Sequence, residues 1–425
     1  MTAQLDIRLD EPAPDPVRWP DLATARPASA RAGVARAIVS RAVRRLPIQV
    51  TFPDGRRWGR GDADAPEMKL IRPDEVFARI GNDVKIGVGE AYMAGDWTTG
   101  DDTDLADLLE PFAARMAHLV PKPLQALRGV VEERLPAHEE NTRNGALRNI
   151  SRHYDLSNDL FAQFLDHSMT YSSAWFPDHV ADLDALDLQA AQERKTDGML
   201  DYAGVGDGTT LLEIGTGWGA LAIRAAQRGA RVTSITISRE QAAYAIERVA
   251  AAGLEDLVEV RLCDYRDVEG TFDAVVSVEM IEAVGEKFWP TYFATIDRLL
   301  APGGKVAIQA ITMGHDRMRA TRRSYGWIHK YIFPGGLIPS LQAIEETLAD
   351  HTRLRVVERR DLGWHYGQTL RLWRERFVAA WPEIEQRGFD ATFRRMWEFY
   401  LAYCEAGFRT NYLGVSQLQI ARLPA

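Results

Sequence analysis

Three glycines follow a short apolar run in the segment TLLEIGTGWG, which covers residues 210–219. Gly215, Gly217 and Gly219 are separated by one residue each, and Glu213 stands just before them. Glycine lets the backbone approach a ligand closely, and the turn between a strand and a helix is a common ligand site of α/β sheets. Such a turn could hold a dinucleotide, a phosphate group or S-adenosylmethionine. An ordinary glycine-rich turn without a ligand is the remaining alternative.

The residues around the turn favour S-adenosylmethionine over the other two ligands. A dinucleotide site prefers the spacing G-x-G-x-x-G and an acid at the end of the second strand, whereas the spacing here is G-x-G-x-G. The second strand ends in Thr236, Ile237 and Ser238, and the next carboxylate along the chain belongs to Glu240. The turn also lacks the Gly-Lys-Ser/Thr signature of a phosphate-binding loop. The ammonium group of S-adenosylmethionine suits the carboxylate of Glu213 better than a phosphate would.

Strand-like and helix-like segments alternate around this turn, from about residue 195 onward. Strands are expected at 210–215, 231–238, 258–265, 272–280 and 304–312, and helices at 220–229, 239–253 and 288–300. This alternation predicts parallel βαβ units, and therefore an α/β doubly wound sheet with helices on both faces. Residues 313–425 are rich in aromatic and helix-forming residues, with one further strand expected at 354–360.

The N-terminal part of the chain has a different pattern. Residues 1–30 are rich in Pro, Ala and Asp, and we expect them to be disordered. Two short strands around a Pro-Asp-Gly turn at 48–61, and helical spacing at 73–81 and 104–120, predict a small α+β domain over 31–135. The polar stretch at 136–150 predicts a linker, which leaves 151–425 as the main domain.

Charge and composition narrow the class of protein. The chain has 51 basic and 60 acidic residues among 425, a net charge of −9, which does not favour nucleic-acid binding. We find no apolar run long enough to span a bilayer, no signal peptide, no His/Cys cluster for a metal, and only two cysteines. A cytoplasmic protein is expected.

The first 60 residues are nevertheless positive, with eleven Arg, no Lys and six acids. A helix within the stretch 30–47 would place Val34, Ala35, Ile38, Val39, Ala42, Val43 and Leu46 on one face and Arg36, Arg41 and Arg44 on the other. A basic amphipathic helix either packs on its own domain or lies on anionic lipid.

Several segments, taken in order, resemble the cyclopropane-fatty-acyl-phospholipid synthase family. They are GVGEAYMAGDW (87–97), HYDLSNDLFAQFLDHSMTYSSAWF (153–176), GTGWG (215–219), VEMIEAVG (278–285), KYIFPGGLIPS (330–340) and YLAYCEAGFRTNY (400–412). Within that family, VSVEMIEAVG and VAIQAITM are closest to the actinobacterial branch implicated in making tuberculostearic (10-methylstearic) acid. The resemblance implies a class I, Rossmann-like methyltransferase fold with a C-terminal helical lid that binds the acyl chain.

The resemblance also implies functional residues. S-adenosylmethionine is expected to be held, together with Glu213, by Tyr171, Ser172, Gly215, Gly217, Trp218, Gly219, Thr236, Ile237, Gln241, Asp264 and Tyr265. The family binds a bicarbonate that removes a proton, and the matching positions are Ser173, Glu282, Gln309, Ile311 and Tyr366. Two of these depart from the family pattern: Ser173 stands where cyclopropane synthases usually have Cys, and Gln309 where they have His.

The implied reaction is transfer of a methyl group to the double bond of an oleoyl-type phospholipid acyl chain. The cation formed on the chain can close a cyclopropane ring, or lose a proton after a hydride shift and give a 10-methylene group. The Gln309 departure and the branch resemblance favour the methylene product, whose reduction would need a separate reductase as partner. The family resemblance also allows a homodimer that works at the inner face of the membrane. A methyltransferase for small molecules and a non-catalytic lipid- or cofactor-binding protein are the rival hypotheses.

Overall fold

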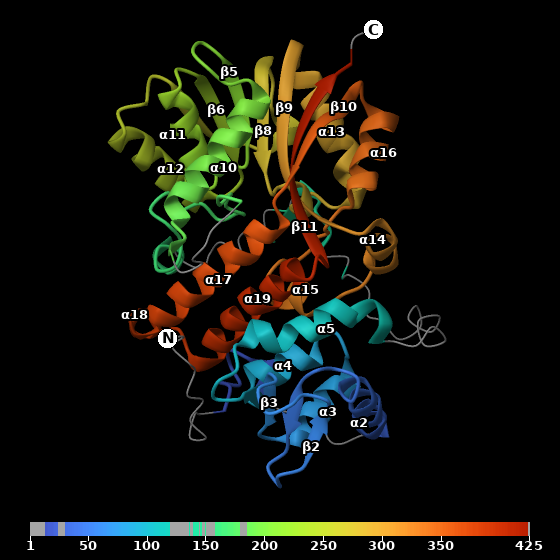
Figure 1. Ribbon diagram of the computed structural model, residues 1–425. Helices are drawn as coiled ribbons and strands as arrows, with labels where there is room; N and C mark the ends of the chain where they lie inside the picture. The colour runs from blue at the N-terminus through green and yellow to red at the C-terminus, as the bar shows by residue number, and fades with distance from the viewer. Residues whose placement is uncertain are drawn as a thin grey trace. The chain divides into compact units, whose positions relative to one another are not determined.

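The computed structural model describes residues 13–23, 30–119, 136, 139–143, 145–146, 149, 158–178 and 185–423. Within the segment 1–30, for which disorder is expected, the structure describes 13–23 and 30 and has a short helix at Pro20–Ala23. Within the linker expected at 136–150, the described residues Glu139, Asn141 and Asn149 are buried. The chain divides into two compact units (Figure 1). Unit 1 comprises Met1–Arg134, Ser324–Ile332 and Leu370–Tyr412, and unit 2 comprises Leu135–Arg323, Phe333–Thr369 and Leu413–Ala425.

Unit 2 is built on a seven-stranded sheet with the order β10-β11-β9-β8-β5-β6-β7. Its strands are β5 (Thr210–Ile214), β6 (Arg231–Thr236), β7 (Val258–Leu262), β8 (Phe272–Val278), β9 (Leu300–Met313), β10 (Leu354–Asp361) and β11 (Leu413–Arg422). The five strands from β5 to β9 pair in parallel, whereas β11 pairs antiparallel with both β9 and β10. The predicted α/β doubly wound fold is therefore confirmed.

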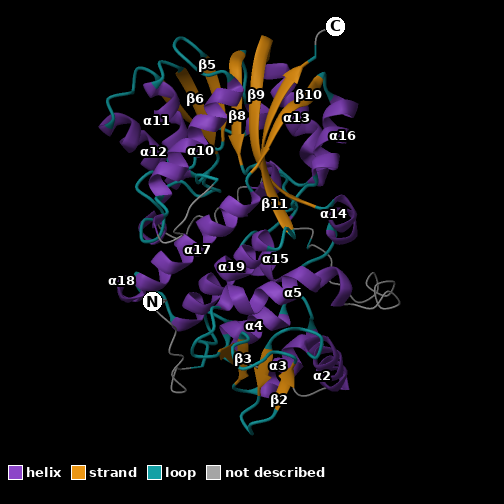
Figure 2. Ribbon diagram, viewed as in Figure 1, coloured by secondary structure: helices purple, strands orange, loops and turns teal. Residues whose placement is uncertain are grey.

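Helices cover both faces of this sheet (Figure 2). Apolar side chains of α10 (Leu188–Ala203), α11 (Ala220–Gln227) and α12 (Arg239–Ala251) form one buried core with the sheet. Those of α13 (Trp289–Leu299) and α16 (Leu341–His351) form the other. Chain order and strand order diverge on either side of β5, and in open α/β sheets ligands bind at the carboxyl ends of the strands around such a point.

Sequence patterns missed strand β11 at the C-terminus. Its alternating residues are not apolar-in and polar-out, because Gln417 is fully buried beside Leu418. A strand with a buried amide does not give the alternation that identifies strands in a sequence. In the pairing of β11 with β9, Gln417 lies opposite Gln309.

Unit 1 contains a four-stranded sheet with the order β2-β1-β3-β4. Its strands are β1 (Gln49–Thr51), β2 (Arg57–Gly59), β3 (Glu67–Leu70) and β4 (Trp97–Thr99). Its helices are α1 (Pro20–Ala23), α2 (Ala30–Val43), α3 (Pro73–Asn82), α4 (Gly87–Met93), α5 (Leu105–Leu119), α15 (Trp327–Tyr331), α18 (Trp381–Gln386) and α19 (Ala391–Arg409). The hairpin and the two helices predicted in this region are present, and β3 and β4 were not predicted.

The boundary between the units differs from the predicted one. Segments 324–332 and 370–412, expected in the methyltransferase domain, belong by their contacts to unit 1. The reason lies in α19, which buries aromatic side chains and packs against α4 and α5. The long helix α17 (Gly363–Ala379) spans both units, since its first seven residues belong to unit 2 and the rest to unit 1.

The apolar face predicted for helix α2 is buried only in part. Ala35, Val43 and Leu46 of that face are buried, as is Ala32, whereas Val34 and Ile38 are 60% and 43% exposed. The buried face is small because α2 approaches α3 closely: a Cβ on Gly81 would lie 2.9 Å from the backbone nitrogen of Ala32. The larger apolar residues are therefore left on the outer side of α2.

The arginines in and after α2 do not all lie on one solvated face, although the sequence predicted this. The guanidinium of Arg36 lies over the rings of Phe52, Trp58 and Phe77, at 5.6–6.0 Å from their centroids, and is thus held on its own domain. Arg31, Arg41, Arg44 and Arg45 are exposed, and within the described residues none of them forms an ion pair with a carboxylate.

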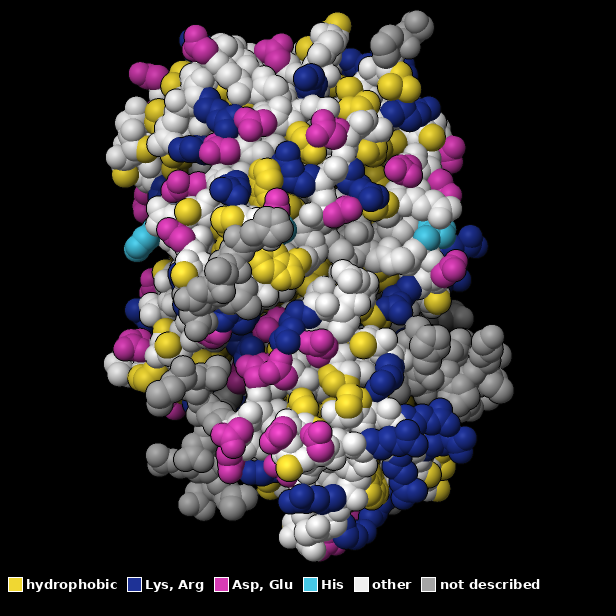
Figure 3. All heavy atoms as spheres, in the orientation of Figure 1, with side chains coloured by type: hydrophobic (Ala, Val, Ile, Leu, Met, Phe, Trp, Pro, Cys, Tyr) yellow, Lys and Arg dark blue, Asp and Glu magenta, His cyan; other side chains and the backbone are white. Residues whose placement is uncertain are grey.

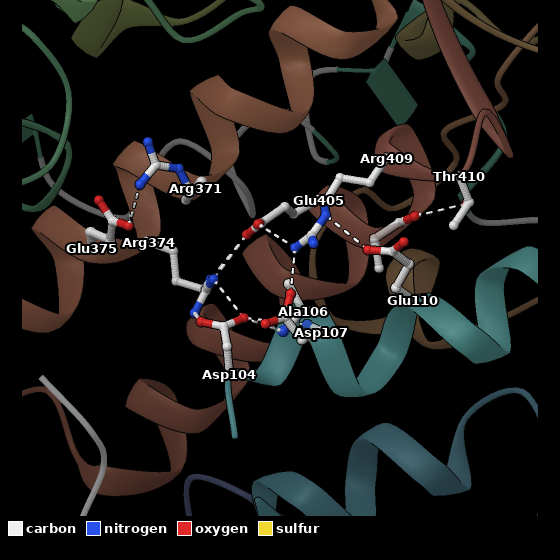
Figure 4. Close-up of polar contacts among 11 residues, drawn as sticks. Asp104, Ala106, Asp107, Glu110, Arg371, Arg374, Glu375, Glu405, Arg409 and Thr410 are labelled. Atoms are coloured by element: carbon white, nitrogen blue, oxygen red, sulfur yellow. Dashed lines mark hydrogen bonds and ion pairs between the residues drawn. The ribbon is translucent and has the colours of Figure 1, made fainter. Parts of the chain in front are cut away.

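A buried charge network joins α5, α17 and α19 within unit 1 (Figure 4). The guanidinium of Arg374 lies between two carboxylates: it donates to Glu405 Oε2 at 3.0 Å and makes a 2.8 Å ion pair with Asp104. Arg409 donates to Glu405 and pairs with Asp107 and Glu110. The side chains of Arg374 and Glu405 are only 7% and 1% exposed, so each charge depends on the others for compensation.

The remaining helices are α9 (Asn158–Phe161) and α14 (His315–Thr321), both in unit 2. Among the described residues, no helix combines the length and the hydropathy needed to cross a bilayer.

Candidate active site

The three positions of the turn after β5 require glycine for different structural reasons. All three have positive φ angles, +99° at Gly215, +52° at Gly217 and +88° at Gly219, which favour glycine. A Cβ on Gly215 would lie 2.6 Å from Cγ of Met280, so the turn has no room for a side chain there. Gly219 caps α11, and a Cβ on it would meet Cβ of Ala245 at 3.2 Å.

A pocket in unit 2 opens beside this turn. Of the twelve residues expected to hold the cofactor, eleven line it: Tyr171, Ser172, Glu213, Gly215, Gly217, Trp218, Thr236, Ile237, Gln241, Asp264 and Tyr265. Gly219 does not line the pocket, because it faces α12 instead. Lys195, Glu279 and Met280 also line the pocket and were not singled out from the sequence.

Glu213 stands at the end of β5 with its carboxylate buried. The hydroxyl of Ser234, on the neighbouring strand β6, donates to Glu213 Oε2 at 2.5 Å and lies 2.7 Å from the hydroxyl of Thr216. Burial raises the pKa of Glu213 to about 8, although the bond from Ser234 opposes this. A cationic ligand group beside Glu213 would stabilise its ionised form.

The far end of the pocket offers hydrogen-bonding groups suited to a nucleoside. Thr236 donates to the side-chain carbonyl of Gln241 at 3.1 Å, which leaves the amide hydrogens of Gln241 to other acceptors. Asp264 accepts two bonds from the guanidinium of Arg266 at 2.8 and 2.6 Å. Burial alone would raise the pKa of Asp264, but the bonds from Arg266 hold it below its usual value.

Tyr265 combines two roles that the sequence left as alternatives. It lines the pocket, and its ring also packs edge-on against Tyr292 of α13, with the centroids 5.4 Å apart. An aromatic ring fixed in this way can offer a face to a planar base.

Lys195 is a buried cation that sequence reasoning missed. It lies on α10, and its ammonium donates to the hydroxyl of Ser172 at 2.7 Å. Gln192, one turn earlier, donates to the backbone carbonyl of Ser172 at 2.9 Å. Burial lowers the pKa of Lys195 to about 8, opposed by the charges of Glu279, Asp166 and Glu213. A lysine in a helical pattern is ordinarily a solvated residue, so only the fold could reveal its position.

The five residues expected to hold bicarbonate gather within unit 2, around a residue that was not predicted. Ser173 donates its backbone N–H to Glu279 Oε1 at 2.9 Å, and the side-chain amide of Gln309 donates to the same oxygen at 2.8 Å. The hydroxyl of Tyr366 donates to the other oxygen, Glu279 Oε2, at 2.7 Å. The backbone N–H of Ile311 donates to Glu282. Glu279 stands inside the segment VEMIEAVG. Its importance follows from the hydrogen bonds that its carboxylate accepts, which the sequence of this segment does not reveal.

The carboxyl groups of the two glutamates after β8, Glu279 and Glu282, influence each other's ionisation. Glu282 Oε2 is buried and, among the described residues, has no hydrogen-bond partner. Burial, and then the charge of Glu279, raise the pKa of Glu282 to about 8. Burial also raises the pKa of Glu279, against the effect of its three hydrogen bonds and the charge of Lys195.

Comparisons with known proteins agree with this geometry. The family model described as mycolic acid cyclopropane synthetase matches residues 141–418. Over 413 residues the chain is 51% identical to tuberculostearic acid methyltransferase UfaA1 of Mycobacterium tuberculosis, which covers 96% of each chain. It is 34% identical over 375 residues to cyclopropane-fatty-acyl-phospholipid synthase of Escherichia coli K12, covering 85% of this chain and 89% of that one.

Solved structures of the same family match about two thirds of this chain. The cyclopropane synthase MmaA2 from Mycobacterium tuberculosis has a TM-score of 0.59 at 30% identity, covering 65% of this chain and 98% of that one. The mycolic acid cyclopropane synthase CmaA1, solved in complex with S-adenosylhomocysteine and CTAB, has the same TM-score and identity, covering 64% and 97%. The chain therefore belongs to the mycolic acid cyclopropane synthetase family and is an S-adenosylmethionine-dependent methyltransferase.

Proposed function

We propose that this enzyme methylates the double bond of oleoyl-type acyl chains in phospholipids and releases a 10-methylene chain. The observation that carries the proposal is the enclosed carboxylate of Glu279, which lines the cofactor pocket and is surrounded by Ser173, Gln309 and Tyr366. Similarity to a tuberculostearic acid methyltransferase along 96% of the chain supports the same substrate class. The methylene chain is then the precursor of a 10-methyl branch.

The residues present fit S-adenosylmethionine. Glu213 suits the ammonium of its amino-acid part, the backbone of the glycine turn can approach that part closely, and Gln241 and Tyr265 suit the nucleoside. When bound, S-adenosylmethionine supplies an electrophilic methyl group to an electron-rich double bond, which leaves positive charge on the acyl chain. The buried carboxylates beside the pocket can stabilise that charge without bulk water.

A product assay tests the proposal. The protein is incubated with S-adenosylmethionine carrying a ¹³C-methyl group and vesicles of oleoyl phospholipid, and the fatty esters are analysed by mass and NMR. We expect labelled vinylidene signals. Ring-proton signals would assign the enzyme as a cyclopropane synthase, and transfer only to small amines or alcohols would refute acyl methylation. Because the methylene and cyclopropane products have equal mass, NMR decides between them.

We propose further that unit 1 docks on the membrane through α2. The basic face of the α2 segment combines positive charge with exposed apolar side chains. It is defined as Arg31, Val34, Ile38 and Arg41 of the helix with Arg44 and Arg45 directly after it. Lys and Arg side chains gather over the region of α2, at the lower right of Figure 3. Arginine attracts anionic headgroups, and apolar side chains enter the interface between them. This would bring the enzyme to its acyl chains at the inner membrane face, where a separate reductase would act as partner on the methylene product.

Vesicle flotation tests the docking. Wild-type protein should float with vesicles containing anionic phospholipid and remain behind with purely zwitterionic ones. Replacing the four arginines of the basic face by Gln should abolish flotation, since each basic residue near an anionic surface contributes about 1 kcal/mol. The control has the same charge change on unit 2, at Arg231, Arg239, Arg353 and Arg359, which are exposed. Equal flotation of wild type and the basic-face variant would contradict the docking.

A further inference from the structure

The residues of this site do not fit the bicarbonate that the family resemblance implies. The donors of Ser173, Gln309 and Tyr366 all point to the carboxylate of Glu279, and the N–H of Ile311 points to Glu282. A bicarbonate in the same place would compete for donors that the chain's own carboxylates already hold. It would also lie beside the carboxyl groups of Glu279 and Glu282, and ionisation of either one would repel a second anion in an environment of low dielectric constant.

The backbone of Glu279 is held in an unusual conformation. Its φ angle is +52°, in the left-handed region where residues other than glycine are uncommon. Such backbone strain persists only where the surroundings fix it, and it is concentrated at functional sites. Here the backbone N–H of Glu279 donates to the carbonyl of Gln309 at 2.8 Å, and three donors hold the carboxylate. The conformation turns the carboxylate toward Ser173, Gln309 and Tyr366.

A chain of side chains fixes the orientation of the Gln309 amide. The guanidinium of Arg360 donates to the carbonyl of Gln417 at 2.8 Å, and the amide of Gln417 donates to the carbonyl of Gln309 at 3.1 Å. The amide hydrogens of Gln309 must then face Glu279. Each of these bonds is polarised in the same direction, from the Arg360 cation toward Glu279. The chain of bonds therefore stabilises negative charge on the carboxylate of Glu279 itself.

We infer that the carboxylate of Glu279 takes the place of bicarbonate and itself accepts the proton from the methylated acyl chain. The inference rests on the proposed function. A C–H bond of the cationic acyl chain breaks, and its electron pair forms the new C=C bond. The proton binds a lone pair of Glu279, which becomes a neutral carboxyl group and returns the proton to water after the product leaves. Burial raises the pKa of Glu279, and the three donors and the charge of Lys195 oppose this and so favour the ionised carboxylate before the step.

The test compares wild type with two variants at Glu279, with and without bicarbonate. Wild-type turnover should be the same in bicarbonate-depleted buffer and in buffer with added bicarbonate. Glu279→Gln keeps the shape and can still accept from Ser173 and Gln309, but it cannot take a proton. It should lose turnover by about 100-fold or more, with cofactor affinity retained. The exposed Glu269→Gln provides a control for the same chemical change.

The second variant, Glu279→Gly, tests the same role of the carboxylate if the side-chain amide of Glu279→Gln perturbs folding. Glu279→Gly suits the positive φ angle and removes the carboxylate, so it should be inactive in depleted buffer and regain turnover with added formate or bicarbonate. Bicarbonate-dependent turnover of wild type, or normal turnover of Glu279→Gln, would overturn the inference while leaving acyl methylation intact. If wild type transfers no methyl group to oleoyl vesicles in any buffer, the proposed function fails instead.

Discussion

Replacing Lys195 by methionine is expected to lower turnover at pH 7 by at least about tenfold and to move the acidic limb of the pH profile upward. The ammonium of Lys195 is buried beside the pocket, and its charge favours the ionised forms of Glu279 and Glu213. A proton acceptor works only when ionised, so turnover falls as the pH drops below its pKa. Without the cation, the pKa of Glu279 rises further, and a higher pH is needed for the same turnover.

The measurement is kcat/KM against pH in the range below 8, where Lys195 of wild type carries its charge. Lys195→Arg keeps the charge and should leave the acidic limb near the wild-type position. Lys305→Met, at an exposed position of β9, is the control for loss of a lysine. Other groups face Glu279, notably Glu282 and Tyr366, but they are unchanged in all of these variants. A uniform loss at every pH, with no shift of the limb, would assign Lys195 only to the positioning of Ser172.

The sequence identified the glycine turn of the cofactor pocket because this turn follows local rules, and the family resemblance implied most of the other pocket residues. Glycines at positive φ, a strand before them and a helix after them are readable from residue types alone. Eleven of the twelve expected residues line one pocket, and the exception, Gly219, is explained by close packing against Ala245. The alternation of strands and helices predicted the parallel sheet for the same reason.

The surroundings of Glu279 could not be predicted from local sequence patterns, because they depend on contacts between segments that are distant in the sequence. Glu279 and Gln309 are 30 residues apart, and Gln309 and Gln417 are 108 apart. Gln417 lies on the strand that sequence patterns missed, and Lys195 lies on a helix whose polar residues suggest exposure. The family resemblance predicted the donors Ser173, Gln309 and Tyr366, but it did not identify Glu279 as the acceptor that they surround.

Replacing Arg374 by methionine is expected to destabilise unit 1 by about 3–5 kcal/mol, because Asp104 loses its 2.8 Å ion pair and the buried carboxylate of Glu405 keeps only the 3.3 Å bond from Arg409. Glu405 is 1% exposed and so cannot recover solvation from water. Arg371, on the same helix α17, pairs with Glu375 on a more exposed surface (Figure 4). The matched control Arg371→Met should cost about 0.5 kcal/mol, the usual contribution of an i,i+4 pair. Hydrogen exchange of the α19 amides in urea measures the local free energy of opening.

The double variant Arg374→Met with Glu405→Leu separates two explanations of this loss. A buried ion pair costs desolvation of both charges, so removing both partners together is often neutral, whereas removing one exposes the full penalty. Asp104 then retains partial exposure and its bonds to the backbone N–H groups of Ala106 and Asp107. The double variant should therefore recover most of the stability lost by Arg374→Met. If it is as unstable as the single variant, the packing of the Arg374 stem, and not charge compensation, stabilises α17 against α19.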